Sequence, residues 1–127
     1  FKPGNHGSTF GGNPLACTAA MTTLAVIEED GLLARARDLG ARIREDFRAA
    51  LADVPGVAEI RGDGLMIGIE LDRPCGALVE RALEHGLLIN VTAERVVRLL
   101  PPLVFTDEDA AHLVRGLAPL IREFLAA

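Results

Sequence analysis

A short polar stretch near the start of the chain carries the residue types best suited to binding an anion. It places two adjacent hydroxyl side chains, Ser8 and Thr9, among the glycines of residues 6–12, just before an apolar helical pattern. Hydroxyl groups bond phosphates and carboxylates, and glycines let a ligand approach the backbone closely. Because a helix start also presents unpaired N–H groups, the stretch predicts an anion site, with a plain helix-entry loop as the alternative. Asn13 and Pro14 suit the N-cap and first helical positions in either case.

Arg98 is a second residue whose side chain suits an anion. It lies in the apolar segment 96–100, where an unpaired buried charge would be costly. A guanidinium binds a carboxylate through two parallel hydrogen bonds, so a carboxylate is one candidate partner. The residues by themselves favour the alternative, a strand arginine that faces solvent because side chains alternate along a strand.

Lysine usage restricts the covalent chemistry that this sequence can support. It has 13 basic residues, and all except Lys2 are arginine. A mechanism that requires a buried lysine nucleophile must therefore use Lys2 or a lysine outside these residues. We interpret the sequence, which begins with Phe1 directly before the polar stretch, as part of a longer polypeptide.

Composition excludes several classes of partner. The 127 residues are 50% hydrophobic, which predicts one ordered domain, and the formal charge of −5 argues against nucleic acid or an anionic membrane surface. With neither Trp nor Tyr and only 5 Phe, stacking platforms for single strands are missing. No apolar run is long enough to span a bilayer. Cys17 and Cys75 lack metal-ligand spacing and are expected to be buried thiols, with a disulfide left open.

Hydrophobic periodicity predicts four helices and four strands. Steps of three and four between apolar residues indicate helices, strict alternation indicates strands, and glycines 62 and 64 indicate a hairpin turn. Arginines mixed with acids on the second helix predict a solvated face, and Gly68 inside a strand predicts close approach by a helix or loop. The pattern defines an α+β fold, with a roughly four-stranded, mostly antiparallel sheet covered by helices on one side. The expected helices cover residues 15–29, 32–52, 74–85 and 107–125, and the expected strands cover residues 57–61, 65–71, 87–91 and 96–100.

Three segments of the sequence resemble the C-terminal part of class III aminotransferases that use pyridoxal phosphate. They are HGSTFGGNPLAC at residues 6–17, VAEIRGDGLMIGIEL at 57–71 and LLINVTAERVVRLLPPLVFTDED at 87–109. The resemblance implies the C-terminal domain of a fold type I transferase. Residues 1–30 would be the active-site loop and linking helix at the end of the large domain, and residues 31–127 the small α+β domain. The Schiff-base lysine would lie upstream of Phe1.

The same resemblance implies roles for individual residues. Thr9 would bond the cofactor phosphate across a homodimer interface, Ser8 would lie against the substrate, and Arg98 would hold a substrate carboxylate. No catalytic residue or metal ligand is expected in this chain, and the chain alone is expected to be inactive.

The implied reaction transfers an amino group between N2-acetylornithine and 2-oxoglutarate, in cytoplasmic arginine biosynthesis. Ornithine or succinylornithine as the substrate is one alternative. A non-catalytic module that binds phosphate or a protein partner is the other.

Overall fold

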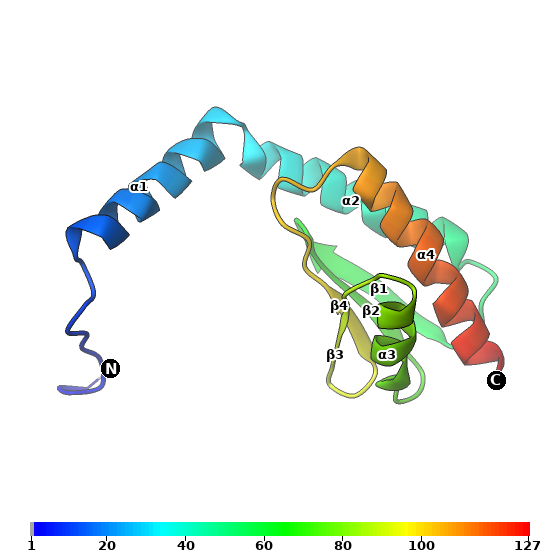
Figure 1. The fold of residues 1–127 in the computed structure, drawn as a ribbon. Helices are drawn as coiled ribbons and strands as arrows, with labels where there is room; N and C mark the ends of the chain where they lie inside the picture. The colour runs from blue at the N-terminus through cyan, green and yellow to red at the C-terminus, as the bar shows by residue number, and fades with distance from the viewer. Residues whose placement is uncertain (1) are drawn as a thin grey trace. The chain divides into compact units, whose positions relative to one another are not determined.

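The computed structural model describes residues 2–127 (Figure 1). Contacts within the chain divide it into two compact units, Phe1–Leu33 and Ala34–Ala127. The first contains the polar loop and helix α1 (Pro14–Glu29), and helix α2 (Leu32–Ala50) begins at its end. The second contains most of α2, a four-stranded sheet, and helices α3 (Ala77–Glu84) and α4 (Asp107–Ala126).

Helix α1 begins and ends where the sequence predicts. The Asn13 side chain accepts a hydrogen bond from the Ala16 N–H at 3.0 Å, Pro14 takes the first helical position, and Gly31 follows the helix with φ +64°. No residue of α1 is buried. Cys17 on α1 is consequently exposed, which corrects the prediction of two buried thiols.

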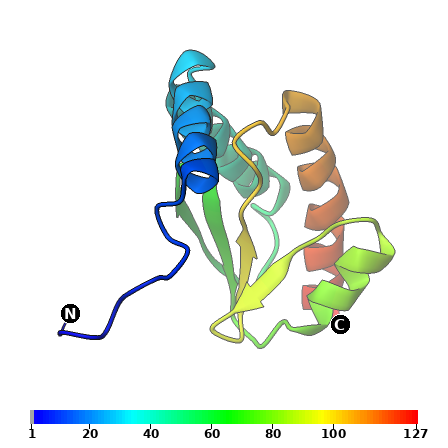
Figure 2. The same ribbon diagram turned by 60° about the vertical axis from the view of Figure 1, so that its left-hand side comes forward.

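The sheet is antiparallel throughout, as the hairpin patterns predict. Its strands are β1 (Val57–Asp63), β2 (Met66–Leu71), β3 (Asn90–Thr92) and β4 (Val96–Leu99), in the order β1-β2-β4-β3. Figure 2 shows α3 and α4 on one side of this sheet. Strand β2 separates the two faces cleanly, because Ile67, Ile69 and Leu71 are fully buried while Gly68 and Glu70 between them are partly exposed.

The core lies between one face of the sheet and three helices. Phe47 of α2, Leu78 of α3 and Leu117 of α4 are fully buried in the same cluster as Ile67 and Ile69. Cys75 also lies in this cluster as a free thiol, and burial raises the pKa of that thiol. The opposite face of the sheet has no helix of the second unit packed on it and carries charged residues. The α+β prediction is therefore confirmed.

Helix α3 and strand β3 both start later than predicted, and the chain between them closes the C-terminal end of the helix. The N–H groups of Gly86 and Leu87 donate to the carbonyls of Leu83 and Ala82 at 3.0 and 2.8 Å, which is a Schellman motif. The Leu87 N–H is therefore used before the sheet begins, and β3 starts at Asn90 instead of residue 87. Helix α3 starts at Ala77 and not at residue 74, and the Cys75 N–H just before it donates to the Glu94 carbonyl at 2.9 Å.

The arginines of α2 do more than face solvent, which corrects a second prediction. Arg35 and Arg42 both pair with Asp107 at the start of α4, at 2.6 and 3.1 Å. Hydrogen bonds from Arg42 and then Arg35 lower the pKa of Asp107. Arg44 donates to the Gly64 carbonyl at 3.1 Å, and Arg48 donates to the Ile60 carbonyl at 3.0 Å. These contacts connect α2 to α4 and to the β1–β2 hairpin.

Close backbone approach occurs at a glycine other than the predicted one. Gly68 faces the open side of the sheet, where a Cβ would meet the Val96 side chain at 3.2 Å and no helix or loop. Gly40, in the middle of α2, is the position where a Cβ would overlap the Gly64 carbonyl oxygen. The hairpin turn itself is formed by Gly64 and Leu65, since Asp63 pairs with Met66. It therefore shares Gly64 with the predicted segment 62–64 and is shifted by one residue to include Leu65.

Candidate functional site

The polar loop presents one hydroxyl that is engaged and one that is not. Ser8 and Thr9 are both exposed. The Ser8 hydroxyl accepts a hydrogen bond from the Gly11 N–H at 2.8 Å, which shapes the turn and leaves the hydroxyl proton available. Within residues 2–127, the Thr9 side chain makes no hydrogen bond. Thr9 is therefore the better placed of the two to bond an anion.

The start of α1 contributes less to an anion site than the sequence predicts. Pro14 has no N–H, the Ala16 N–H goes to the Asn13 side chain, and the Cys17 N–H goes to the Asn13 carbonyl at 3.0 Å. Asn13 also donates to the Phe10 carbonyl at 2.7 Å, which ties the loop to the helix. The helix start therefore offers at most the N–H of Leu15, and the anion-binding capacity of the loop rests mainly on its hydroxyls.

Arg98 lies on the open face of the sheet, in register with Gly68 of β2 on one side and Asn90 of β3 on the other. Its side chain is exposed, while Val97 and Leu99 on either side of it point into the core. Among the described residues, no carboxylate pairs with its guanidinium. The exposed guanidinium therefore has N–H donors that can meet a ligand.

A second arginine shares this face, and it is fully engaged. Arg61 on β1 is in register with Gly68, and its guanidinium contacts Glu59 at 2.7 Å and Glu70 at 2.6 Å. The hydrogen bonds to Glu70 and then to Glu59 raise the pKa of Arg61. This ion-pair cluster of Glu59, Arg61 and Glu70 was not predicted from the sequence. Alternation of Glu59 and Arg61 along one strand was the signal available, but their partner Glu70 depends on the strand register.

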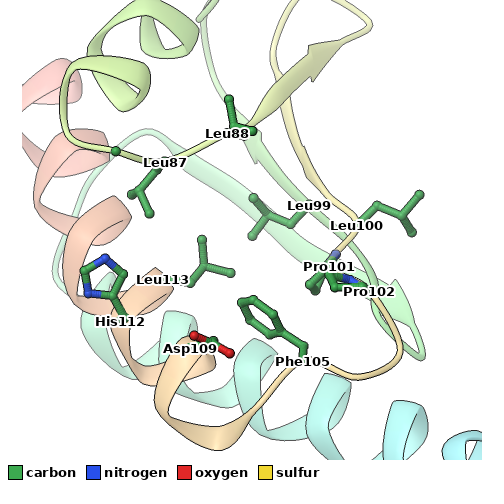
Figure 3. A pocket seen from close by; sticks show the side chains of 11 residues that line it. Leu87, Leu88, Leu99, Leu100, Pro101, Pro102, Phe105, Asp109, His112 and Leu113 are labelled. Atoms are coloured by element: carbon green, nitrogen blue, oxygen red, sulfur yellow. The ribbon is translucent and has the colours of Figure 1, made fainter.

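The structure brings Ser8 and Thr9 together in the first unit and places Arg98 in the second. A cavity of about 490 Å³ in the second unit contains none of the three (Figure 3). It is lined mainly by leucine, proline and phenylalanine side chains of residues 86–88, 99–102, 105, 109, 112 and 113, with Asp109 and His112 at one end. Asp109 is occupied in a capping box at the start of α4, since it accepts hydrogen bonds from the Thr106 N–H and hydroxyl.

The described part of the chain has neither a metal-ligand cluster nor a membrane-spanning helix. Residues 2–127 contain no cluster of three His, Cys, Asp or Glu side chains that could hold a metal ion. None of the helices in that part combines the length and the apolar character needed to cross a membrane.

The fold is that of an α+β protein. Its open sheet face has a guanidinium that is unpaired among the described residues, and a glycine-rich loop with two hydroxyl groups precedes its first helix, so both places suit small anionic molecules. The chain matches the class-III aminotransferase family over residues 1–121, and it belongs to that family. It is 60% identical over 126 residues to acetylornithine aminotransferase 1 of Bordetella parapertussis, covering 99% of this chain and 32% of that protein. The acetylornithine aminotransferase of Nitrosomonas europaea is 52% identical over 125 residues, with 98% and 32% covered.

Solved structures show the same similarity. The acetylornithine aminotransferase of Elizabethkingia anophelis superposes with a TM-score of 0.85 at 39% identity, covering 98% of this chain and 34% of that one. An ornithine aminotransferase structure from Toxoplasma gondii, with partial occupancy of pyridoxal phosphate at its active site, gives a TM-score of 0.86 at 40% identity, with 99% and 31% covered. The chain thus spans about a third of the length of the relatives that it matches.

Class-III aminotransferases are pyridoxal-phosphate enzymes, and the residues present fit one part of that cofactor. The exposed Thr9 hydroxyl, unpaired within the described residues, can donate to the phosphate. The cofactor aldehyde requires a lysine, and Lys2 is the only one in the sequence. The chain therefore has a hydroxyl that fits the phosphate and no second lysine for the aldehyde.

Proposed function

We propose that this chain is the C-terminal part of an aminotransferase that moves an amino group between N2-acetylornithine and 2-oxoglutarate in arginine biosynthesis. The observation that carries the proposal is the 60% identity to an acetylornithine aminotransferase over 99% of the chain. An exposed guanidinium that pairs with nothing in the described residues supports it, because both substrates carry a carboxylate. When bound, the cofactor supplies the electron sink for the reaction, and the residues of this chain hold and orient its ligands.

In this proposal each unit of the chain has its own task. Residues 1–30 form the active-site loop and linking helix, which reach the partner subunit of a cytoplasmic homodimer, and residues 31–127 form the small domain. Thr9 donates to the cofactor phosphate, and Ser8 lies against the substrate. Arg98 fixes the substrate carboxylate through its planar fork.

The full-length protein, purified and assayed with 2-oxoglutarate, tests the substrate assignment. We expect the largest kcat/KM with N2-acetylornithine as amino donor, above ornithine and N2-succinylornithine. The ornithine aminotransferases among the similar structures make ornithine the second candidate, and a preference for it would transfer the proposal to that reaction. The 127-residue chain alone serves as the control and should show neither turnover nor a saturable cofactor absorbance band. Absence of amino transfer from all three donors would contradict the proposal and favour a non-catalytic module.

Thr9→Ala in the full-length dimer should weaken cofactor binding by about 1.5–3 kcal/mol, the size of a lost hydrogen bond to a charged group. Cofactor titration followed by absorbance measures this change. Thr23→Ala is a matched control, because the Thr23 hydroxyl donates to the Ala19 carbonyl of its own helix at 2.8 Å. Unchanged affinity in Thr9→Ala would remove Thr9 from the cofactor site.

Mixed dimers test whether the loop acts across the subunit interface. A Thr9→Ala subunit is paired with a subunit that lacks the Schiff-base lysine. If the loop crosses the interface, the lysine of the first subunit and the Thr9 of the second form one intact site. We expect one normal cofactor site per such dimer, and a dimer with none would place Thr9 in its own subunit's site.

A further inference from the structure

On the open sheet face, the carboxylate of Glu70 has two arginines as possible partners. Arg61 of β1, Gly68 of β2 and Arg98 of β4 lie in one row, because Gly68 is the register partner of both arginines. Glu70 lies two residues along β2 on the same face, where its register partners are Glu59 and Val96 and the two arginines are its diagonal neighbours on the adjacent strands. Long side chains reach such diagonal neighbours in a sheet. Glu70 can therefore meet either arginine by geometry.

The structure shows which arginine Glu70 contacts. Its carboxylate accepts from the Arg61 guanidinium at 2.6 Å, and Glu59 joins the same guanidinium at 2.7 Å. Because β1 and β4 lie on opposite sides of β2, this contact directs Glu70 towards β1 and away from Arg98. The Arg98 guanidinium has no carboxylate partner in residues 2–127 as a result.

We propose that Arg61 is a positioning residue that holds Glu70 on the β1 side of the sheet and so keeps Arg98 available to the substrate carboxylate. This inference rests on the proposed function, since it assumes that Arg98 binds that carboxylate. Without Arg61, Arg98 is the arginine that remains among the register and diagonal neighbours of Glu70 on this face. An internal carboxylate on Arg98 competes with the substrate for the same guanidinium, so it weakens substrate binding without altering the chemistry of the bound substrate.

Steady-state kinetics of the full-length aminotransferase test this competition. Arg61→Gln should raise the KM for 2-oxoglutarate by roughly two- to sixfold with kcat unchanged, the strength that an exposed Arg–Glu pair has as a competitor. The double variant Arg61→Gln with Glu70→Gln should return KM to within about twofold of the unsubstituted enzyme, because the competing carboxylate is gone. Arg61→Lys retains a cation beside Glu70, so its KM should rise less than that of Arg61→Gln.

Arg122→Gln is the matched control. Arg122 is another exposed arginine held by a carboxylate, Asp53 at 2.8 Å, but it lies on α4 away from this sheet face. Its loss should leave both KM and kcat unchanged. A general folding defect caused by Arg61→Gln would lower the amount of active enzyme and would not be reversed by Glu70→Gln.

Comparison with Arg98→Gln separates this inference from the proposed function. If Arg98 does not bind substrate, Arg98→Gln leaves KM unchanged, and the proposed role of Arg98 fails first. If Arg98→Gln raises KM but Arg61→Gln does not, the positioning role alone is overturned. The same holds if Glu70→Gln fails to reverse the effect of Arg61→Gln. In the Arg98→Gln background, Arg61→Gln should cause no further rise in KM, because the guanidinium that Glu70 would occupy is absent.

Discussion

Arg98→Lys in the full-length enzyme should lower kcat/KM for both the amino donor and 2-oxoglutarate by roughly tenfold to a few hundredfold. That range corresponds to a lost charge-assisted contact of about 1.5–3 kcal/mol. Lysine keeps the positive charge but cannot form the two parallel hydrogen bonds of a guanidinium, so charge alone should not rescue binding. Both substrates should be affected, because the proposal assigns Arg98 to a carboxylate that each of them carries.

Two readouts distinguish this role from a structural one. The cofactor absorbance of Arg98→Lys should stay normal, because Arg98 is proposed to contact substrate and not the phosphate. The unfolding midpoint should also change little, since the side chain is exposed and pairs with nothing in the described residues. Unchanged kcat/KM for both substrates would make Arg98 an ordinary solvent-facing strand residue.

Local sequence patterns correctly predicted the helices and strands of the fold, but they misplaced several of the residues at which these elements begin. The alternation of Ile67, Ile69 and Leu71 with smaller or polar residues predicts β2 and its buried face, and the structure confirms both. The start of β3 was wrong because the Leu87 N–H closes helix α3. The start of α3 at Ala77 also differs from the predicted residue 74. The error at β3 comes from a hydrogen bond whose partner the periodicity does not encode.

The candidate site shows the same division. Residue type made Ser8, Thr9 and Arg98 candidates, and the family resemblance supplied their roles, which stay predictions. Whether Arg98 has a partner could not be read from the sequence, because the answer depends on β2 lying between β1 and β4 and on Glu70 contacting Arg61. The exposure of Cys17 was also missed, because the apolar pattern of α1 suggested burial whereas no residue of α1 is buried.

Gly40 is the position where a single added methyl group should damage the fold most. In α2, Gly40 faces the β1–β2 hairpin, and a Cβ built on it overlaps the carbonyl oxygen of Gly64. That oxygen belongs to the backbone of a tight turn, where Gly64 has φ +50°, and it also accepts a hydrogen bond from Arg44 at 3.1 Å. It cannot move aside as a flexible side chain could, so the helix and hairpin would have to separate.

Gly40→Ala should therefore lower the free energy of unfolding of the full-length protein by about 3 kcal/mol or more, at the upper end of the usual cost of overpacking. The loss should appear although alanine favours a helix over glycine by about 1 kcal/mol. Denaturant midpoints with unchanged slope measure the change.

Gly116→Ala is the matched control for Gly40→Ala. Gly116 also lies within a helix, α4, but a Cβ there meets only the far end of the Leu87 side chain, at 3.0 Å. Both variants gain the same helix preference, so the difference between them isolates the contact with the turn carbonyl. Gly116→Ala should change stability by less than about 1 kcal/mol in either direction, since a leucine side chain can shift by a few tenths of an ångström. Equal midpoints for the two variants would mean that α2 and the hairpin do not pack as closely as the structure shows.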